Sequence, residues 1–183
     1  MNHREDAILI AKCLKGDKKA QRQLFGHYRH YWFMCCLRYA SNKVEAEDML
    51  QDGLVSVFTN LRQFDSRKSA FGTWSYKIMV NASLQYLRKW RKIDNNTFTE
   101  DQYQHLSVEP GIYGQLGVKE LLTMVQKLPY GYRVVFNLYV IEGYKHHEIA
   151  EKLKISVNTS KSQLFKAKRM LRIELERVLQ NQG

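Results

Sequence analysis

Proline and glycine are scarce in this sequence of 183 residues, which contains two and ten of them respectively. Both residues interrupt helices, so their scarcity favours long helical segments. Apolar residues also recur at helical spacing, and the strict alternation of apolar and polar residues that is typical of half-buried strands is almost absent. The sequence therefore predicts an all-α fold.

Long apolar runs are missing as well. The run Tyr31–Leu37 ends at Arg38 and is far shorter than the roughly 18 apolar residues that a membrane-spanning helix needs, and no secretory signal is visible. There are only three cysteines, Cys13, Cys35 and Cys36, and an odd number suits buried thiols in a reducing compartment better than disulfides. We expect a soluble, cytoplasmic protein without direct membrane insertion.

Acidic residues are outnumbered by basic ones. The chain has 29 Lys and Arg against 18 Asp and Glu, a net charge of +11, which indicates a polyanionic partner. Residues 93–115 differ, because they contain four acidic residues, no Lys or Arg, and the turn-forming pair Pro110 and Gly111. We interpret the chain as a basic domain over 1–92, a flexible acidic linker over 93–115 and a second basic domain over 116–183, although the acidity can equally serve solubility alone.

Several helix boundaries are marked by local signals. Gly16 is expected to end a first helix that starts near Glu5, and Asp17 is expected to cap a second one. A third helix should begin near Asn42, with Glu45 placed to complete a capping box. Its apolar stripe comprises Ala46, Leu50, Leu54, Val57, Phe58 and Leu61.

The same third helix carries an acidic stripe in an otherwise cationic domain. Its carboxylates are Glu45, Asp48 and Asp52, and Glu47 and Gln51 lie beside them. Because these carboxylates would repel DNA, the stripe indicates a basic protein partner. An ordinary solvent-exposed face would show the same pattern.

A fourth helix, expected over residues 73–92, carries a cationic and amide stripe at spacings of three and four. Its members are Lys77, Asn81, Gln85, Arg88 and Lys92. Amide side chains can hydrogen-bond to base edges, while Lys and Arg neutralise phosphates. The alternative is a solvated face opposite a core that includes Trp74, Ile78 and Ala82.

The second domain contains a predicted helix-turn-helix. Pro129 separates helices expected over 118–128 and 132–141; residues 146–153 form the next helix, and Ser156 caps the last one. Ala150 allows the two final helices to cross closely. The outward face of the last helix presents Asn158, Thr159, Lys161, Ser162, Phe165, Lys166, Lys168 and Arg169. This mixture of polar and cationic groups suits the DNA major groove.

Nothing in the sequence supports catalysis. The segment His146-His147-Glu148 lacks the second histidine, four residues after the first, that a zinc-protease helix needs. There is no glycine-rich phosphate loop and no pair of cysteines with metal-ligand spacing. We therefore expect no metal, no cofactor and no enzymatic activity.

Taken in order, these segments resemble the extracytoplasmic-function (group four) sigma factors of bacterial RNA polymerase. The resemblance is carried by residues 45–52 (EAEDMLQD), 71–74 (FGTW), 80–81, 87–88, 128–129, 133–136 (RVVF), 148–150 (EIA) and 158–164 (NTSKSQL). It covers nearly the whole chain except the linker. One departure is Gln163, which stands where many relatives have arginine and leaves the recognised minus-35 sequence open.

The resemblance implies a role for each surface. The acidic stripe would dock on the clamp helices of the largest polymerase subunit, and the linker would pass through the basic RNA channel. The stripe around Asn81 and the loop Asp65–Gly72 would hold the minus-ten non-template strand, with one base flipped into a pocket. The last helix would read the minus-35 element, with Lys161, Ser162, Phe165 and Lys166 at the family's contact positions. An anti-sigma factor is implied as a further partner.

Two other functions remain open at this level. A stand-alone helix-turn-helix regulator would dimerise and bind duplex operators unaided, and only the segment Ile173–Leu179 offers a dimer face. A nucleic-acid-processing enzyme would need carboxylates that hold a metal, for which Glu45–Asp52 is the only candidate.

Overall fold

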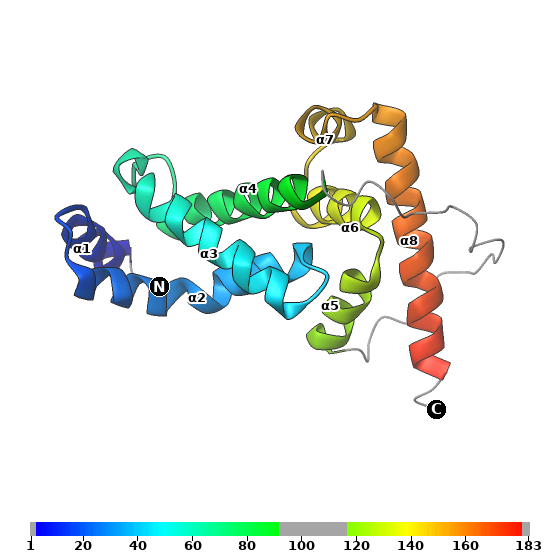
Figure 1. Cartoon of the computed structure of the whole chain (residues 1–183), viewed down its shortest axis with the longest axis horizontal. Helices are drawn as coiled ribbons and strands as arrows, with labels where there is room; N and C mark the ends of the chain where they lie inside the picture. Colours follow the sequence, from blue (N-terminus) through cyan, green and yellow to red (C-terminus); the bar gives the residue numbers. More distant parts are fainter. Residues whose placement is uncertain (1–2, 92–116, 181–183) are drawn as a thin grey trace. The chain divides into compact units, whose positions relative to one another are not determined.

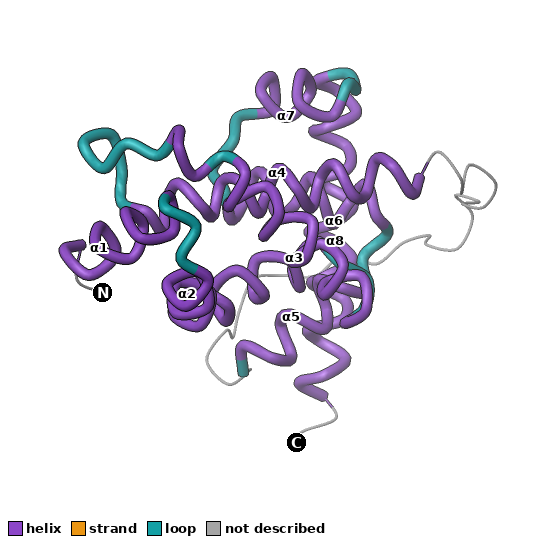
Figure 2. The backbone as a smooth tube through the Cα atoms, turned by 60° about the vertical axis from the view of Figure 1, so that its left-hand side comes forward, coloured by secondary structure: helices purple, strands orange, loops and turns teal. Residues whose placement is uncertain are grey.

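The computed structural model describes residues 3–91 and 117–180, and every element in these ranges is helical. The first range contains α1 (His3–Leu14), α2 (Lys18–Tyr39), α3 (Lys43–Thr59), the short 3-10 helix η1 (Leu61–Gln63) and α4 (Phe71–Arg91). The second contains α5 (Val118–Lys127), α6 (Tyr130–Phe136), the π-helical turn η2 (Asn137–Ile141), α7 (His146–Leu153) and α8 (Val157–Gln180). The all-α prediction is confirmed for the described residues (Figures 1 and 2).

The helices form two compact units, α1–α4 and α5–α8. The expected linker, residues 93–115, lies outside the described residues, and so does Lys92. The exact domain limits therefore stay a prediction.

The helix starts of the first unit follow the expected local chemistry. Asp17 accepts hydrogen bonds from the backbone N–H groups of Lys19 and Ala20 at 2.8 and 3.1 Å, and Asn42 accepts one from Glu45 at 2.9 Å. Gly16 ends α1 with φ +84°, a conformation that side chains disfavour. These caps satisfy N–H groups that no helical carbonyl can reach.

In the first unit, α2, α3 and α4 pack around a common core, and α1 rests on α2 (Figure 1). The most buried face of α3 consists of Ala46, Met49, Gly53 and Val57. The predicted stripe was thus partly wrong, because Leu50 and Leu54 are only half-buried. Gly53 explains the difference, since a Cβ there would collide with the Met79 side chain of α4, so the missing side chain lets the two helices approach closely.

The second unit is built around the long helix α8, which contacts α5, α6 and α7. The helix expected over 132–141 is in fact α6 followed by the π-helical turn η2. Within it, Asn137 is buried and its side-chain amide donates to the carbonyl of Arg133 over 2.9 Å, while Glu142 N–H donates to the Asn137 carbonyl over 3.0 Å. That last bond spans five residues and produces the π-helical geometry.

Two further features of the described residues are the state of the cysteines and the apolar character of the helices. Cys13, Cys35 and Cys36 are free thiols and all three are buried. Among the described residues, no helix combines the length and the apolar character needed to cross a membrane.

Candidate nucleic-acid and protein interfaces

The acidic surface of α3 consists of Glu45, Asp48, Gln51 and Asp52. Asp48, Gln51 and Asp52 are exposed, whereas Glu45 is half-buried. The Glu45 carboxylate accepts two hydrogen bonds from Ser41, one from its backbone N–H and one from its hydroxyl, both at 2.7 Å. Glu45 therefore closes the N-terminus of α3, and the other three side chains face outward.

Asp48 also links α3 to α4. The Tyr86 hydroxyl donates a hydrogen bond to Asp48 Oδ2 over 3.0 Å. Burial raises the pKa of Tyr86 to about 12, aided by this hydrogen bond and by the negative charges of Asp48, Glu45 and Asp52. Tyr86 therefore remains a neutral donor at physiological pH, and the carboxylates of α3 act together on this one hydroxyl.

Two valines that the sequence analysis left out lie on the same face of α3. Val44 is 68% exposed and Val55 is 64% exposed. With Asp48 and Gln51 between them, they follow spacings of four, three and four residues, which places all four on one helix face. The pattern was visible in the sequence as two apolar residues outside the core stripe. It gives the acidic surface an apolar end on either side.

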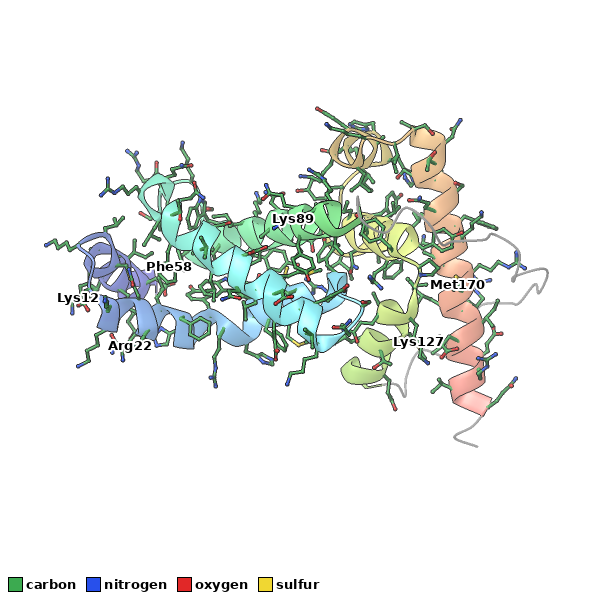
Figure 3. All side chains as sticks on the ribbon, in the orientation of Figure 1. Lys12, Arg22, Phe58, Lys89, Lys127 and Met170 are labelled. Carbon is green, nitrogen blue, oxygen red and sulfur yellow. The ribbon has the colours of Figure 1, made fainter. Side chains whose placement is uncertain are left out.

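The basic face of α4 consists of Lys77, Asn81, Gln85 and Arg88, all of them exposed. The other side of α4 supplies core residues, among them Met79 and Leu84. Cationic side chains also project from other parts of this unit, as at Lys12, Arg22 and Lys89 (Figure 3).

The segment that enters α4 is held in a defined turn. Arg67 donates from Nε and Nη2 to the two carboxylate oxygens of Asp65, at 3.0 and 2.9 Å, and its backbone N–H donates to the same carboxylate. These hydrogen bonds lower the pKa of Asp65. Trp74, expected in the core, is only half-buried and packs against Phe64 and Phe71, with ring centroids 5.4 and 5.7 Å away.

The predicted helix-turn-helix is present in α7 and α8. Lys154 adopts a left-handed conformation with φ 55°, and the N–H of Ile155 donates to the carbonyl of Ala150 over 3.0 Å, which ends α7. Ser156 caps α8 by accepting from the Thr159 N–H over 2.9 Å. Ala150, predicted to lie where the two helices cross, is buried, and so is Ser160 of α8, whose hydroxyl lies beside His146 of α7.

Glu148 and His146 have roles inside this motif. The Glu148 carboxylate accepts from the backbone N–H of Lys145 over 2.7 Å and so caps α7. His146 Nδ1 lies 3.0 Å from the Ser160 hydroxyl, and burial, together with the charges of Lys161 and Lys168, lowers the pKa of His146. Among the described residues there is no group of three or more side chains able to hold a metal ion.

The recognition face of α8 presents the predicted polar and cationic side chains. Asn158, Lys161, Ser162, Phe165, Lys166 and Lys168 are exposed, while Thr159 and Arg169 are half-buried. Phe165 is 69% exposed, a large apolar ring among cations. Two hydroxyls are already engaged, because Thr159 Oγ1 lies 2.8 Å from the Ser156 hydroxyl and Ser162 donates to the Thr159 carbonyl over 3.0 Å.

The structure thus brings the acidic surface and the basic face together in one unit, on neighbouring helices, and puts the recognition face in the other unit. Two family descriptions match the same division. Sigma-70 region 2 matches residues 24–93, and Sigma-70 region 4 matches residues 119–171.

Relatives match over most of the chain. The ECF RNA polymerase sigma factor SigW of Bacillus subtilis (strain 168) is 30% identical over 179 residues, which cover 91% of this chain and 94% of SigW. The RNA polymerase sigma-H factor of Pseudomonas aeruginosa is 26% identical over 190 residues and 98% of either chain. A solved structure of the sigma factor RpoE with the anti-sigma factor NepR from Bartonella quintana has a TM-score of 0.50 at 20% identity, covering 85% of this chain and 96% of that one. That likeness is one of fold.

Proposed function

The chain belongs to the extracytoplasmic-function family of RNA polymerase sigma factors, and from this premise we propose that its three exposed surfaces divide promoter recognition between them. Members of this family are non-enzymatic initiation factors that direct RNA polymerase to promoters. The observation that carries the proposal is the order of these surfaces within the two matched regions. The acidic surface and basic face lie within region 2, and the recognition face lies within region 4.

The acidic surface is assigned to the polymerase. Glu45, Asp48, Gln51 and Asp52 would dock on the clamp helices of the largest subunit. The charge of the chain supports this assignment, because a carboxylate stripe on a protein of net charge +11 is the part least suited to DNA. The exposed Val44 and Val55 add apolar contact at both ends of the stripe.

The basic face is assigned to the minus-ten element. Lys77 and Arg88 would neutralise phosphates, while Asn81 and Gln85 present amides that can hydrogen-bond to unpaired bases. Lys92, predicted to extend this face, lies outside the described residues. The loop Asp65–Gly72 would hold the non-template strand and receive one flipped base, which costs a few kcal/mol of unstacking.

The recognition face is assigned to the minus-35 element. Exposed Lys161, Lys166 and Lys168 suit phosphate contacts, and Asn158 and Ser162 suit base edges. Phe165 offers an apolar contact for a thymine methyl group. Arg169 would complete the cationic border, and the linker over 93–115 would thread the RNA channel of the polymerase.

The location and the regulation of the protein are also part of this proposal. We place the protein in the cytoplasm, with the polymerase and the chromosome. An anti-sigma factor is proposed as its inhibitor, the kind of partner present in the Bartonella complex. Co-purification of the tagged chain from its own cells, followed by an inhibition assay with the captured protein, tests this part.

The central experiment mixes the purified chain with sigma-free core polymerase and measures co-elution, then transcription from promoters next to its own gene. We expect a stable complex that starts transcripts at a defined site. If the chain ignores a cognate core and binds duplex DNA tightly alone, it acts as a stand-alone regulator and the proposed division of surfaces is wrong.

A further inference from the structure

A pocket of about 360 Å³ lies between α1 and the segment that leads into α4. It is lined by Asp6, Ala7 and Ile10 of α1 and, across from them, by residues 64 and 66–71. The two sides are far apart in sequence, and α1 precedes the part of the chain that matches Sigma-70 region 2. The pocket therefore includes side chains that the family match does not cover.

The wall and the border of this pocket differ in chemistry. Phe64 and Phe71 line the pocket and meet edge to face with their centroids 5.4 Å apart. Phe71 is 1% exposed, so the half-buried Phe64 is the ring of this pair that a ligand can reach. Arg67 and Lys68 are exposed on the same segment, and the guanidinium of Arg67 is held in place by Asp65. A partly exposed aromatic ring beside exposed cations suits a base with its phosphate, because the base can pack on Phe64 while the phosphate meets the cations.

Asp6 is the acidic member of the lining. It is 7% exposed, and its Oδ2 accepts a hydrogen bond from the Tyr28 hydroxyl over 2.6 Å. A carboxylate has about four lone-pair sites, so the hydrogen bond from Tyr28 leaves room for Asp6 to accept further hydrogen bonds. Tyr28 is itself fixed, since it stacks on Trp32 at 5.4 Å and meets Phe71 edge to face at 5.1 Å. The carboxylate is therefore held in one orientation with acceptor capacity to spare.

We propose that Asp6 determines which base this pocket accepts: a base with an exocyclic amino group enters, and thymine is rejected. The inference rests on the proposed function, in which this loop receives a flipped base of the minus-ten strand. An ionised carboxylate accepts hydrogen bonds and donates none. Adenine, cytosine and guanine each present an amino group to it, whereas the carbonyl oxygens of thymine flank its single N–H and are repelled.

The charge of Asp6 also selects the part of the nucleotide that enters. A buried carboxylate repels phosphate, so the backbone stays with Arg67 and Lys68 and the neutral base occupies the interior. A purely structural role predicts something else. In that case Asp6 only anchors Tyr28 and favours the first turn of α1, and base preference does not depend on it.

The test uses the full chain bound to core polymerase and a pool of single-stranded minus-ten oligonucleotides with randomised positions. Sequencing of the retained strands should show one position depleted in thymine for the wild-type protein. In Asp6→Asn the new amide can donate to a thymine carbonyl, so the depletion should fall by about tenfold, the value of one hydrogen bond to a charged group. Tyr28→Phe is the control for a structural role, because it removes the hydrogen bond that anchors Asp6 but keeps the carboxylate, and it should retain the depletion.

A second measurement needs no variant and applies even if Asp6→Asn does not fold. At the depleted position the preferred base is replaced by its analogue without the amino group, such as purine for adenine or hypoxanthine for guanine. Wild-type holoenzyme should bind the analogue about tenfold more weakly. Equal binding, or unchanged thymine depletion in a folded Asp6→Asn, overturns the inference.

The remaining outcomes separate this inference from the proposed function. If the holoenzyme retains no more DNA than core polymerase alone, the proposed function fails. If it retains DNA with no position depleted in thymine, or if Tyr28→Phe abolishes the depletion as fully as Asp6→Asn, only the role of Asp6 is wrong.

Discussion

Tyr86 of α4 donates a hydrogen bond over 3.0 Å to Asp48 of α3, and this bond joins the two helices that carry the acidic surface and the basic face. Asp48, which is proposed to contact the polymerase, is thus hydrogen-bonded to α4, the helix proposed to hold the minus-ten strand. Substitutions at Asp48 alter helix packing as well as charge, and experiments on docking must separate the two effects.

Replacing Tyr86 by phenylalanine removes that bond and should lower the free energy of unfolding by about 1 kcal/mol near neutral pH. The pKa of Tyr86 is about 12 in the folded protein, and tyrosine in an unfolded chain ionises near 10. Between these values the unfolded chain loses its proton first, so the contribution of Tyr86 to stability is present below about pH 10 and is lost as the pH rises toward 12.

Denaturant unfolding of both proteins at about pH 8 and about pH 11 checks this expectation. The stability difference should shrink at the higher pH. Other tyrosines are common to both proteins, and their effects cancel in the comparison. A difference that stays constant across this range would mean that burial and the bond to Asp48 do not raise the pKa of Tyr86 in the folded protein.

Reversing charge in the acidic surface should abolish binding to core polymerase. Asp48→Arg combined with Asp52→Arg replaces two exposed carboxylates by cations, which a basic partner repels. Native gel shifts with core polymerase measure the loss, and circular dichroism verifies that the helices remain. Glu47→Arg, the same reversal one position away on α3, is the control and should bind more tightly than the double variant. Full assembly by a folded double variant would exclude this docking site.

Asn81→Ala should impair promoter opening and leave core binding intact. Asn81 is exposed on α4. Its amide can both donate hydrogen bonds to and accept them from an unpaired base. Permanganate footprinting of the minus-ten bubble should show a loss of roughly tenfold or more. Lys89→Ala, also exposed on α4, is the control and should retain the bubble. If Asn81→Ala opens the promoter as the wild type does, Asn81 is not part of the minus-ten interface.

Lys161→Ala combined with Lys166→Ala should weaken promoter binding and reduce its salt dependence. Each lost phosphate contact lowers the slope of log affinity against log salt by about 0.9, so the pair lowers it by up to roughly 2. Binding isotherms of the holoenzyme over a salt series give the slope. Lys18→Ala with Lys19→Ala removes the same charge from exposed positions of α2 and should leave the slope closer to that of the wild type. An unchanged slope in the Lys161→Ala, Lys166→Ala variant would mean that these two lysines do not contact DNA phosphates.

Local signals in the sequence predicted most helix boundaries and the surfaces that face solvent. Asp17, Asn42 and Ser156 were recognised as caps because a cap depends only on the three residues that follow it. The exposed residues of α3, α4 and α8 could be assigned for a similar reason, since helical spacing alone decides which side chains share a face. Their roles in binding remain predictions.

Tertiary contacts decided what spacing could not. Met49 and Gly53 line the most buried face of α3, where the apolar pattern pointed to Leu50 and Leu54, because Gly53 leaves room for a side chain from another helix. Residues 137–141 form a π-helical turn where the periodicity predicted a regular helix.

The pocket beside Asp6 shows most clearly that spacing along the sequence does not predict tertiary contacts. Helical periodicity and capping rules act over a few residues, so the sequence by itself determined the helices and their exposed faces. The meeting of Asp6 with Tyr28 and with residues 64–71 depends on how α1 packs against the rest of its unit. Only the folded chain brings such distant residues together, since the burial of side chains from several helices at once decides their packing.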